Sequence, residues 1–162
     1  MKHKMDEFTP QLALVDMIPV LAFAVAMLLL FQQFQSGLFL AGAILCSVAG
    51  LLKVAWKLVL AFCHRDIPLL SLQLRVLMPL GFAFILASLF LHRNHISIPL
   101  IRAAVFSVPA VLFFAVAAVL LLCMCICAVA LDRKSARANW VEQGINSLAQ
   151  ISVLMGIIFA LQ

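Results

Sequence analysis

Four ionisable side chains interrupt the apolar segments of this sequence: Asp16, Lys53, Lys57 and Glu142. Each such group inside a membrane-spanning helix costs about 2.5–3.5 kcal/mol on insertion scales and usually faces the interior of the helix bundle. Two of the groups are acidic and two are basic, so Asp16–Lys57 and Glu142–Lys53 ion pairs of purely structural importance are one interpretation. The other is a binding site, in which the lysines suit an anionic group.

The two lysines differ in depth within the segment 38–63. At 1.5 Å per residue, Lys57 lies about 9–10 Å from the end of that segment and Lys53 about 15 Å from it. A lysine stem can bend toward the headgroups, which is plausible for Lys57 and strained for Lys53. We therefore expect Lys53 to lie inside the bundle, paired with Glu142 or Asp16.

The helical wheel gives the same expectation for the lysines. At 100° per residue they share an arc with Gly42, Cys46 and Gly50, and Trp56 flanks that arc. Small residues spaced in this way allow close packing of one transmembrane helix on another. The lysines thus belong to a packing face, not to a face directed at lipid.

A second polar stripe runs along the segment 139–161. Its members share one side of the predicted helix, with Gln143 at the edge: Asn139, Glu142, Asn146, Ala149 and Gln150. Side-chain amides inside a membrane form hydrogen bonds between helices, each worth about 1 kcal/mol or less. The stripe therefore either stabilises helix–helix packing through hydrogen bonds or forms one wall of a polar site.

Depth connects the stripe with the lysines. If the N-terminus is cytoplasmic, polar residues from three spans fall in the cytoplasmic half of the bundle. A convergent polar cluster in an apolar bundle is a candidate binding site. The predicted site residues are Asp16, Lys53, Trp56, Lys57, Glu142, Asn146 and Gln150.

The elements that must position these residues follow from composition. The chain has 162 residues, of which 67% are hydrophobic and only 10% charged, far from the composition of a soluble domain. Continuous apolar runs, without period-two alternation, predict helices and exclude a membrane β-barrel. We expect an all-α integral membrane protein, with a tail at 1–10 and one domain at 11–162. Its five spans cover about 12–34, 38–63, 74–91, 99–131 and 139–161.

Two prolines modify these predicted spans. The third span is expected to be interrupted at Pro79, close to Gly81. The fourth span is longer than a bilayer requires, so we expect it to tilt, to protrude, or to bend at Pro109.

The distribution of basic residues predicts the orientation. Seven lie on one side of the predicted membrane: Lys2, Lys4, Arg65, Arg75, Arg133, Lys134 and Arg137. Two lie on the other: Arg93 and Arg102. Because positive charge marks cytoplasmic loops, we expect the N-terminus in the cytoplasm and the C-terminus outside, in a bacterial-type inner or plasma membrane.

Other chemistry has little support in the sequence. The net charge of +5 comes from loop residues and not from a basic patch with interleaved aromatic residues, so no nucleic-acid partner is expected. Cys123 and Cys127 share a helical face from which Cys125 is turned away, which argues against a metal site. With no established zinc, serine, nucleotide or dithiol motif, we expect no cofactor, and an enzyme is the less favoured class.

Three functions remain open. The first is a transporter or pore-forming subunit that binds a small solute, with the lysines favouring an anion. Because five spans enclose little volume, this reading expects a homo-oligomer or a partner membrane subunit in the lipid bilayer. The second is an accessory or assembly subunit of a larger membrane complex, without transport of its own. The third is a lipid-modifying enzyme that uses Glu142 or Asp16 as an acid or base.

Overall fold

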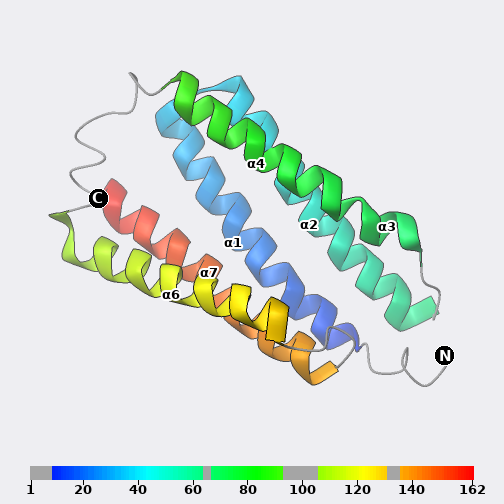
Figure 1. Ribbon diagram of the computed structural model, residues 1–162. Helices are drawn as coiled ribbons and strands as arrows, with labels where there is room; N and C mark the ends of the chain where they lie inside the picture. Colours follow the sequence, from blue (N-terminus) through cyan, green and yellow to red (C-terminus); the bar gives the residue numbers. More distant parts are fainter. Residues whose placement is uncertain (1–8, 64–66, 93–105, 131–135) are drawn as a thin grey trace.

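A computed structural model describes residues 9–63, 67–92, 106–130 and 136–162 of the chain. These residues form helices joined by short connections (Figure 1): α1 (Pro10–Phe34), α2 (Gly37–Cys63), α3 (Pro68–Leu72), α4 (Leu74–Leu91), α6 (Val108–Ala130) and α7 (Ala136–Leu161). Five of them, all except α3, are long and apolar enough to cross a membrane. The all-helical, multi-span class predicted from the apolar runs is thus confirmed.

The turn between α1 and α2 is built by local hydrogen bonds. Gln35 adopts a left-handed conformation with φ 45°, and its N–H donates to the Phe31 carbonyl at 2.8 Å. The next residue, Ser36, accepts a hydrogen bond through its hydroxyl from the N–H of Phe39 at 3.4 Å. A helix cap on each side of a two-residue link folds α2 back along α1.

One of the two proline expectations is corrected by the observed helices. Helix α4 continues through Pro79 without interruption, as α1 does through Pro19. Pro79 is the sixth residue of α4, so only one carbonyl near the helix start loses its partner. Phe106 is helical and Ser107 is not, and helix α6 begins at Val108, so Pro109 stands in the first turn after this break, where a proline is tolerated. The expected tilt, protrusion or bend at Pro109 stays a prediction. The predicted residues 99–105 lie outside the described part.

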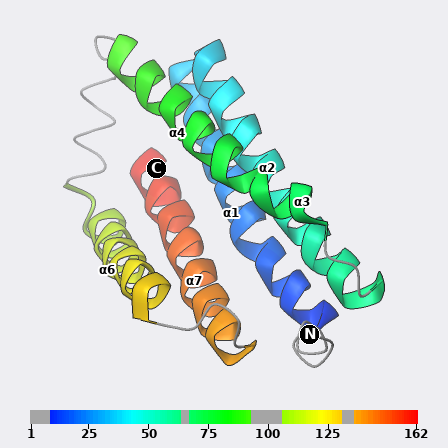
Figure 2. The same cartoon turned by 45° about the vertical axis from the view of Figure 1, so that its right-hand side comes forward.

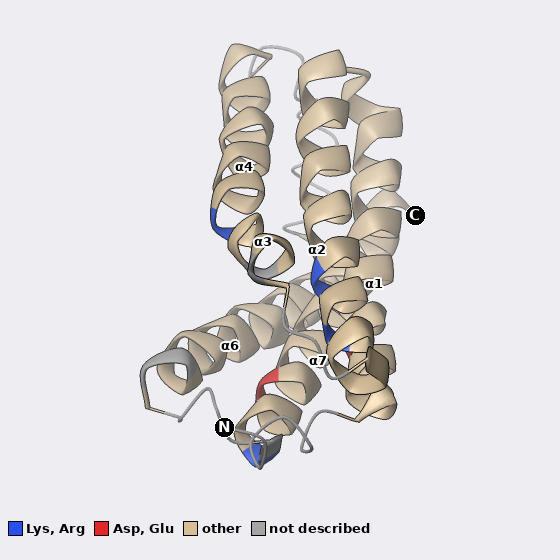
Figure 3. Cartoon of the chain, turned by 90° about the vertical axis from the view of Figure 1, so that its right-hand side faces the viewer, with Lys and Arg blue, Asp and Glu red and all other residues tan. Residues whose placement is uncertain are grey.

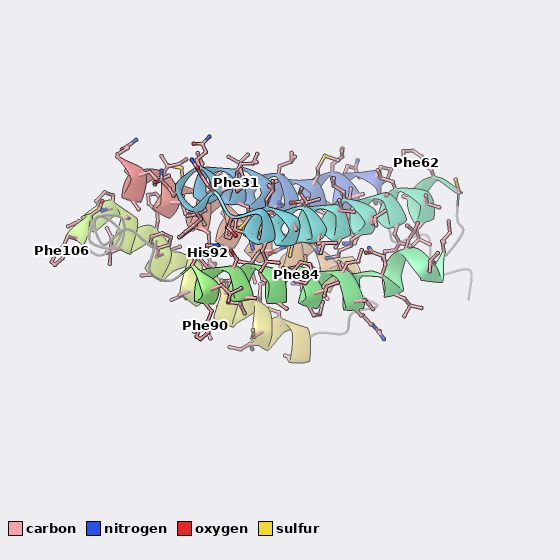
Figure 4. The ribbon with its side chains drawn as sticks, turned by 90° about the horizontal axis from the view of Figure 1, so that it is seen from above. Phe31, Phe62, Phe84, Phe90, His92 and Phe106 are labelled. Carbon is pink, nitrogen blue, oxygen red and sulfur yellow. The ribbon has the colours of Figure 1, made fainter. Side chains whose placement is uncertain are left out.

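The helices pack in a row and do not close into a ring. Helix α6 packs on α7, α7 on α1, α1 on α2, and α2 on α4. In Figure 1, α1 runs between α4 on one side and the α6–α7 pair on the other. Seen from above, α4 and α6 both lie on the same side of the α1–α2 pair (Figure 4). The row is therefore curved, and the inner side of α1 faces the space between its two arms (Figure 2).

Glycines bring α2 and α4 into close contact. A methyl group at Gly42 would lie 2.6 Å from the Gly81 carbonyl oxygen, and one at Gly81 would lie 2.5 Å from the Cys46 sulfur. Gly50 lies on the same ridge but meets α1, where a methyl group would approach Val20 to 2.8 Å. The predicted small-residue ridge of α2 is confirmed as a packing face, and it serves two neighbouring helices.

The apolar core sits away from the charged residues. Phe39, Cys46 and Ile85 form its buried centre, with side chains of α1 packed around them. Beside it, the Ser88 hydroxyl donates to the Ser36 hydroxyl at 2.8 Å and joins the far ends of α2 and α4. This core holds together the halves of α1, α2 and α4 that lie away from the charged residues.

Candidate intramembrane binding site

Charged residues gather toward one end of the bundle (Figure 3). This is the end where α1 and α7 begin and where α2 and α6 end, and we call it the charged end. The helix bounds place every charged residue of the described part of the chain in the half of its helix nearest this end: Asp16, Lys53, Lys57, Arg75, Arg137 and Glu142. The same-half placement predicted for the four intramembrane charges agrees with this arrangement.

The centre of the group is an ion pair between α1 and α2. The ammonium of Lys57 contacts a carboxylate oxygen of Asp16, and the two side chains are only 4% and 3% exposed. Both charges are therefore removed from lipid and from solvent. A buried pair of this kind holds two helices in one register, because losing either partner strands the other charge.

Matched depth explains why these two residues meet. Asp16 lies six residues after the start of α1 at Pro10, and Lys57 lies six residues before the end of α2 at Cys63. Since α1 and α2 are antiparallel neighbours, both sit about 9 Å from the same end. Glu142 also lies six residues from a helix end, that of α7 at Ala136. Three helices thus each place one charge at a common level.

Both lysines lie at Asp16, so the Asp16–Lys57 pair and the pairing of Lys53 with Asp16, both considered from the sequence, are found. Lys57, for which bending toward the headgroups was plausible, is the buried partner of Asp16. Lys53 does lie beside Asp16, with its nitrogen 4.0 Å from a carboxylate oxygen, but 33% of its side chain is exposed. The expected burial of Lys53 is only partial, because Asp16 lies at the level of Lys57 and not of Lys53.

Glu142 has no ion-pair partner within 4.0 Å among the described residues. Its carboxylate still attracts the Lys57 ammonium at longer range. One carboxylate oxygen is buried without a hydrogen-bond partner in the described part of the chain. The predicted Glu142–Lys53 pair is therefore not formed among the described residues, and the acid that both lysines meet is Asp16 of α1.

A pocket of about 100 Å³ lies next to the charged group. Helices α1, α2, α4 and α7 all contribute to it, although α4 and α7 share no extensive contact with each other in the described part. The pocket therefore opens between these two helices. Its wall consists of Pro19, Val20, Phe23, Cys46, Gly50, Met78, Phe82, Asn146 and Gln150.

The amides of Asn146 and Gln150 provide the polar part of this wall. They stand four residues apart and follow Glu142 by four and eight residues, so all three lie along one face of α7. Neither amide forms a hydrogen bond within the described part of the chain. The pocket thus presents unused donors and acceptors in an otherwise apolar, aromatic surface.

The pocket and the charged residues adjoin along three helices. Asp16 precedes the wall residue Pro19 by three positions, Lys53 follows Gly50 by three, and Glu142 precedes Asn146 by four. Each separation is about one helical turn, or roughly 5 Å. The arrangement can hold a ligand whose anionic group meets Lys53 and whose remaining part enters the pocket.

Sequence reasoning missed several polar residues near this site. Gln143, placed only at the edge of the stripe, is 3% exposed, and Ser147 is 7% exposed. Their side-chain oxygens are buried without partners in the described residues. Gln73, at the start of α4, donates to the Ala49 carbonyl at 3.3 Å. The four-residue spacing of Gln143 and Ser147 was the signal that would have marked a second, buried polar face.

The remaining predicted residues stand apart from the pocket. Trp56 is half-buried on α2 and is not one of the wall residues. Cys125 is exposed, while Cys123 and Cys127 are half-buried, and all three are free thiols. In the described part of the chain, no group of three or more metal-binding side chains comes together.

Comparison with known proteins gives no relationship. No protein family, curated protein or solved structure matches the chain. The site therefore has to be interpreted from its own chemistry.

Proposed function

We propose that this protein is a small membrane transport subunit that binds an anionic solute beside Lys53. The observation that carries the proposal is the state of that lysine. Lys57 is the close partner of Asp16, while the Lys53 ammonium lies 4.0 Å from the same acid and keeps a third of its side chain exposed. One acid faces two cations, so Lys53 retains attraction for an incoming anion.

The pocket supports the proposal with hydrogen-bonding groups. Asn146 and Gln150 line it from α7, opposite the wall residues of α2 and α4. Ligand sites of membrane and soluble proteins combine an apolar surface with a few converging polar groups. Amides orient a ligand without adding charge, which leaves Lys53 as the group that selects for anions.

We propose further that the charged end is cytoplasmic, in a bacterial-type inner or plasma membrane. Arg75 and Arg137 are each the second residue of a span, α4 and α7, and these helices begin toward this end. Positive charge near span ends marks the cytoplasmic side. The site would then open to the cytoplasmic half of the bilayer.

A flux assay tests the transport proposal. Purified protein in liposomes is loaded with chloride, phosphate or acetate, and efflux of each anion is measured. We expect Lys53→Ala and Gln150→Ala to lower the flux of the transported anion, while Arg137→Ala, which removes an exposed charge from the same end, leaves it unchanged. Equal flux in all four proteins would show that the cluster is structural only.

The alternative function is an accessory subunit of a larger complex, and one observation favours it. The helix row has two open arms, and α6 packs extensively only on α7 among the described helices. A partner subunit or a second copy of the chain would cover these surfaces. Purification in a gentle detergent distinguishes the two, because a stoichiometric unrelated partner supports an accessory role and a homo-oligomer supports a transporter.

A further inference from the structure

The size of the pocket limits what it can enclose. Its volume is about 100 Å³, whereas ligand pockets usually measure about 300–1,000 Å³. A cavity of about 150 Å³ is the size that holds benzene. A small anion fits this volume, whereas only a short part of an extended ligand fits, and the rest of such a ligand must be covered by something other than this chain.

The position of the pocket opening indicates what encloses the part of the ligand that lies outside the pocket. The pocket opens between α4 and α7, two helices long and apolar enough to span the membrane. In Figure 1 the inner side of α1 is visible between the two arms of the row, with no described helix in front of it. An opening between two spans faces the hydrocarbon of the bilayer, so a ligand with an acyl chain can enter sideways.

The depth of Lys53 agrees with a lipid headgroup. Helices α1 and α2 have 25 and 27 residues, which makes them about 37–40 Å long. They exceed the hydrocarbon thickness of roughly 30 Å by about 5 Å at each end. The Lys53 ammonium lies 4.0 Å from the Asp16 carboxylate, and Asp16 is about 9 Å from the helix ends. The ammonium therefore lies only about 4–5 Å below the boundary of the hydrocarbon layer.

We infer that the ligand is an anionic lipid, held with its phosphate at Lys53 and the upper part of its acyl chain in the pocket, against the wall that Phe23 and Phe82 form. The inference rests on the proposed function, because it concerns the same site and names the class of ligand. A lipid needs the least enclosure of any anionic ligand, since the bilayer covers the part of the chain that the pocket leaves out. The amides of Asn146 and Gln150 face the ester region of such a molecule.

Tryptophan quenching tests the inference. Trp56 stands three residues from Lys53 on α2, and Trp140→Phe removes the other tryptophan of the chain. The protein is placed in bilayers containing phosphatidic acid or phosphatidylcholine, brominated near the headgroup end of the acyl chain. We expect phosphatidic acid to quench Trp56 more strongly. Lys53→Gln should lower this preference about fivefold, the effect of one basic residue on binding an anionic lipid.

Matched variants separate the site from general charge. Lys53→Arg keeps the charge and should keep the preference, and Arg137→Gln, which removes a charge at the same end, should also keep it. Gln150→Phe fills the pocket without changing any charge, so it should weaken quenching by phosphatidic acid even if Lys53→Gln fails to fold. Equal quenching by both lipids, or a preference that survives both Lys53→Gln and Gln150→Phe, overturns the inference.

Two further arms identify the source of the phosphate. If free inorganic phosphate abolishes the preference at constant ionic strength, the ligand is a soluble anion, which contradicts the lipid inference and leaves the transport proposal standing. If the lipid preference is present while liposomes show no anion flux, the inference stands and the transport proposal fails. The two claims are thus tested by different readouts.

Discussion

At the scale of single residues, one carboxylate determines the charge arrangement. Asp16 meets two ammonium groups of the neighbouring helix, one buried with it and one partly exposed at 4.0 Å. The buried pair is a structural element, because desolvation makes each of its charges dependent on the other. Lys53, the partly exposed lysine, is the group that the proposed ligand would meet. The two lysines, four residues apart on α2, therefore have different roles.

Removing the buried lysine should be costly. Lys57→Met leaves the Asp16 carboxylate without its close partner, and breaking such a pair typically costs about 3–5 kcal/mol. Lys53→Met should cost less, because that side chain is partly exposed and 4.0 Å from the acid. Thermal unfolding in detergent, followed by circular dichroism, measures both.

The double variant Lys57→Met/Asp16→Asn provides the control for this prediction. It removes both buried charges, so part of the lost stability should return. If Lys53→Met proves more destabilising than Lys57→Met, the assignment of the buried partner is wrong.

Replacing Glu142 should have little effect on the stability of the protein. It forms no ion pair within 4.0 Å in the described chain, so Glu142→Gln removes a charge without stranding another close by. We expect a change in unfolding free energy of less than about 1 kcal/mol, within the usual range for substitutions that break no buried network. Asp16→Asn, measured in parallel, should cost clearly more. Comparable losses in the two variants would mean that Glu142 supports the bundle as Asp16 does.

At the scale of elements, close helix contacts position the site. Gly42 and Gly81 let α2 and α4 approach until a methyl group on either would collide with the other helix. This contact brings Met78 and Phe82 of α4 over Cys46 and forms one side of the pocket. Packing of small residues thus determines the shape of the polar site.

A pair of glycine substitutions tests this packing. In Gly81→Ala the new methyl group would lie 2.5 Å from the Cys46 sulfur and 2.9 Å from the Gly42 carbonyl oxygen. Overpacking of this kind typically costs about 1–3 kcal/mol. Gly144→Ala on α7 meets nothing within 4 Å and should stabilise the helix by about 0.5–1 kcal/mol. Thermal unfolding of both proteins should give shifts of opposite sign, and shifts of the same sign would contradict the α2–α4 contact.

The sequence predicted the elements better than their contacts. Apolar run length is a local property, so the spans ending at Phe34, Cys63 and Leu161 were found within a few residues. The interruption at Pro79 was wrong because a proline early in a helix loses little. Whether Lys53 or Lys57 meets Asp16 depends on the register of α1 against α2. A comparison of depths between those two spans would have revealed it.

The pocket could not be predicted from the sequence, and the reason is not the register of two helices but the order of all of them. Asn146 and Gln150 were recognised from their stripe, but Phe23 and Phe82 have no distinguishing pattern in apolar segments full of phenylalanine. Their proximity depends on the order of the helices in the row. That order is a property of the whole fold and cannot be read from one sequence.

At the scale of the whole molecule, five spans place the two ends of the described chain on opposite sides. Helix α1 begins at the charged end, and α7 finishes at the other. With the charged end in the cytoplasm, a C-terminal reporter that is active only in the cytoplasm should be silent, and one active only outside should give signal. The opposite pattern would invert the orientation and move the site to the outer leaflet.

The central claim is that the pocket beside Lys53 holds a ligand that comes from the membrane. Crystals grown in a lipid mesophase with brominated phosphatidic acid test it directly, because anomalous scattering locates bromine. The account predicts an anomalous peak in the pocket, beside Phe23 and Phe82, with the lipid phosphate at the Lys53 ammonium. Bromine found only on the outer faces of the helices, with α4 packed against α7 and the pocket closed, would contradict it.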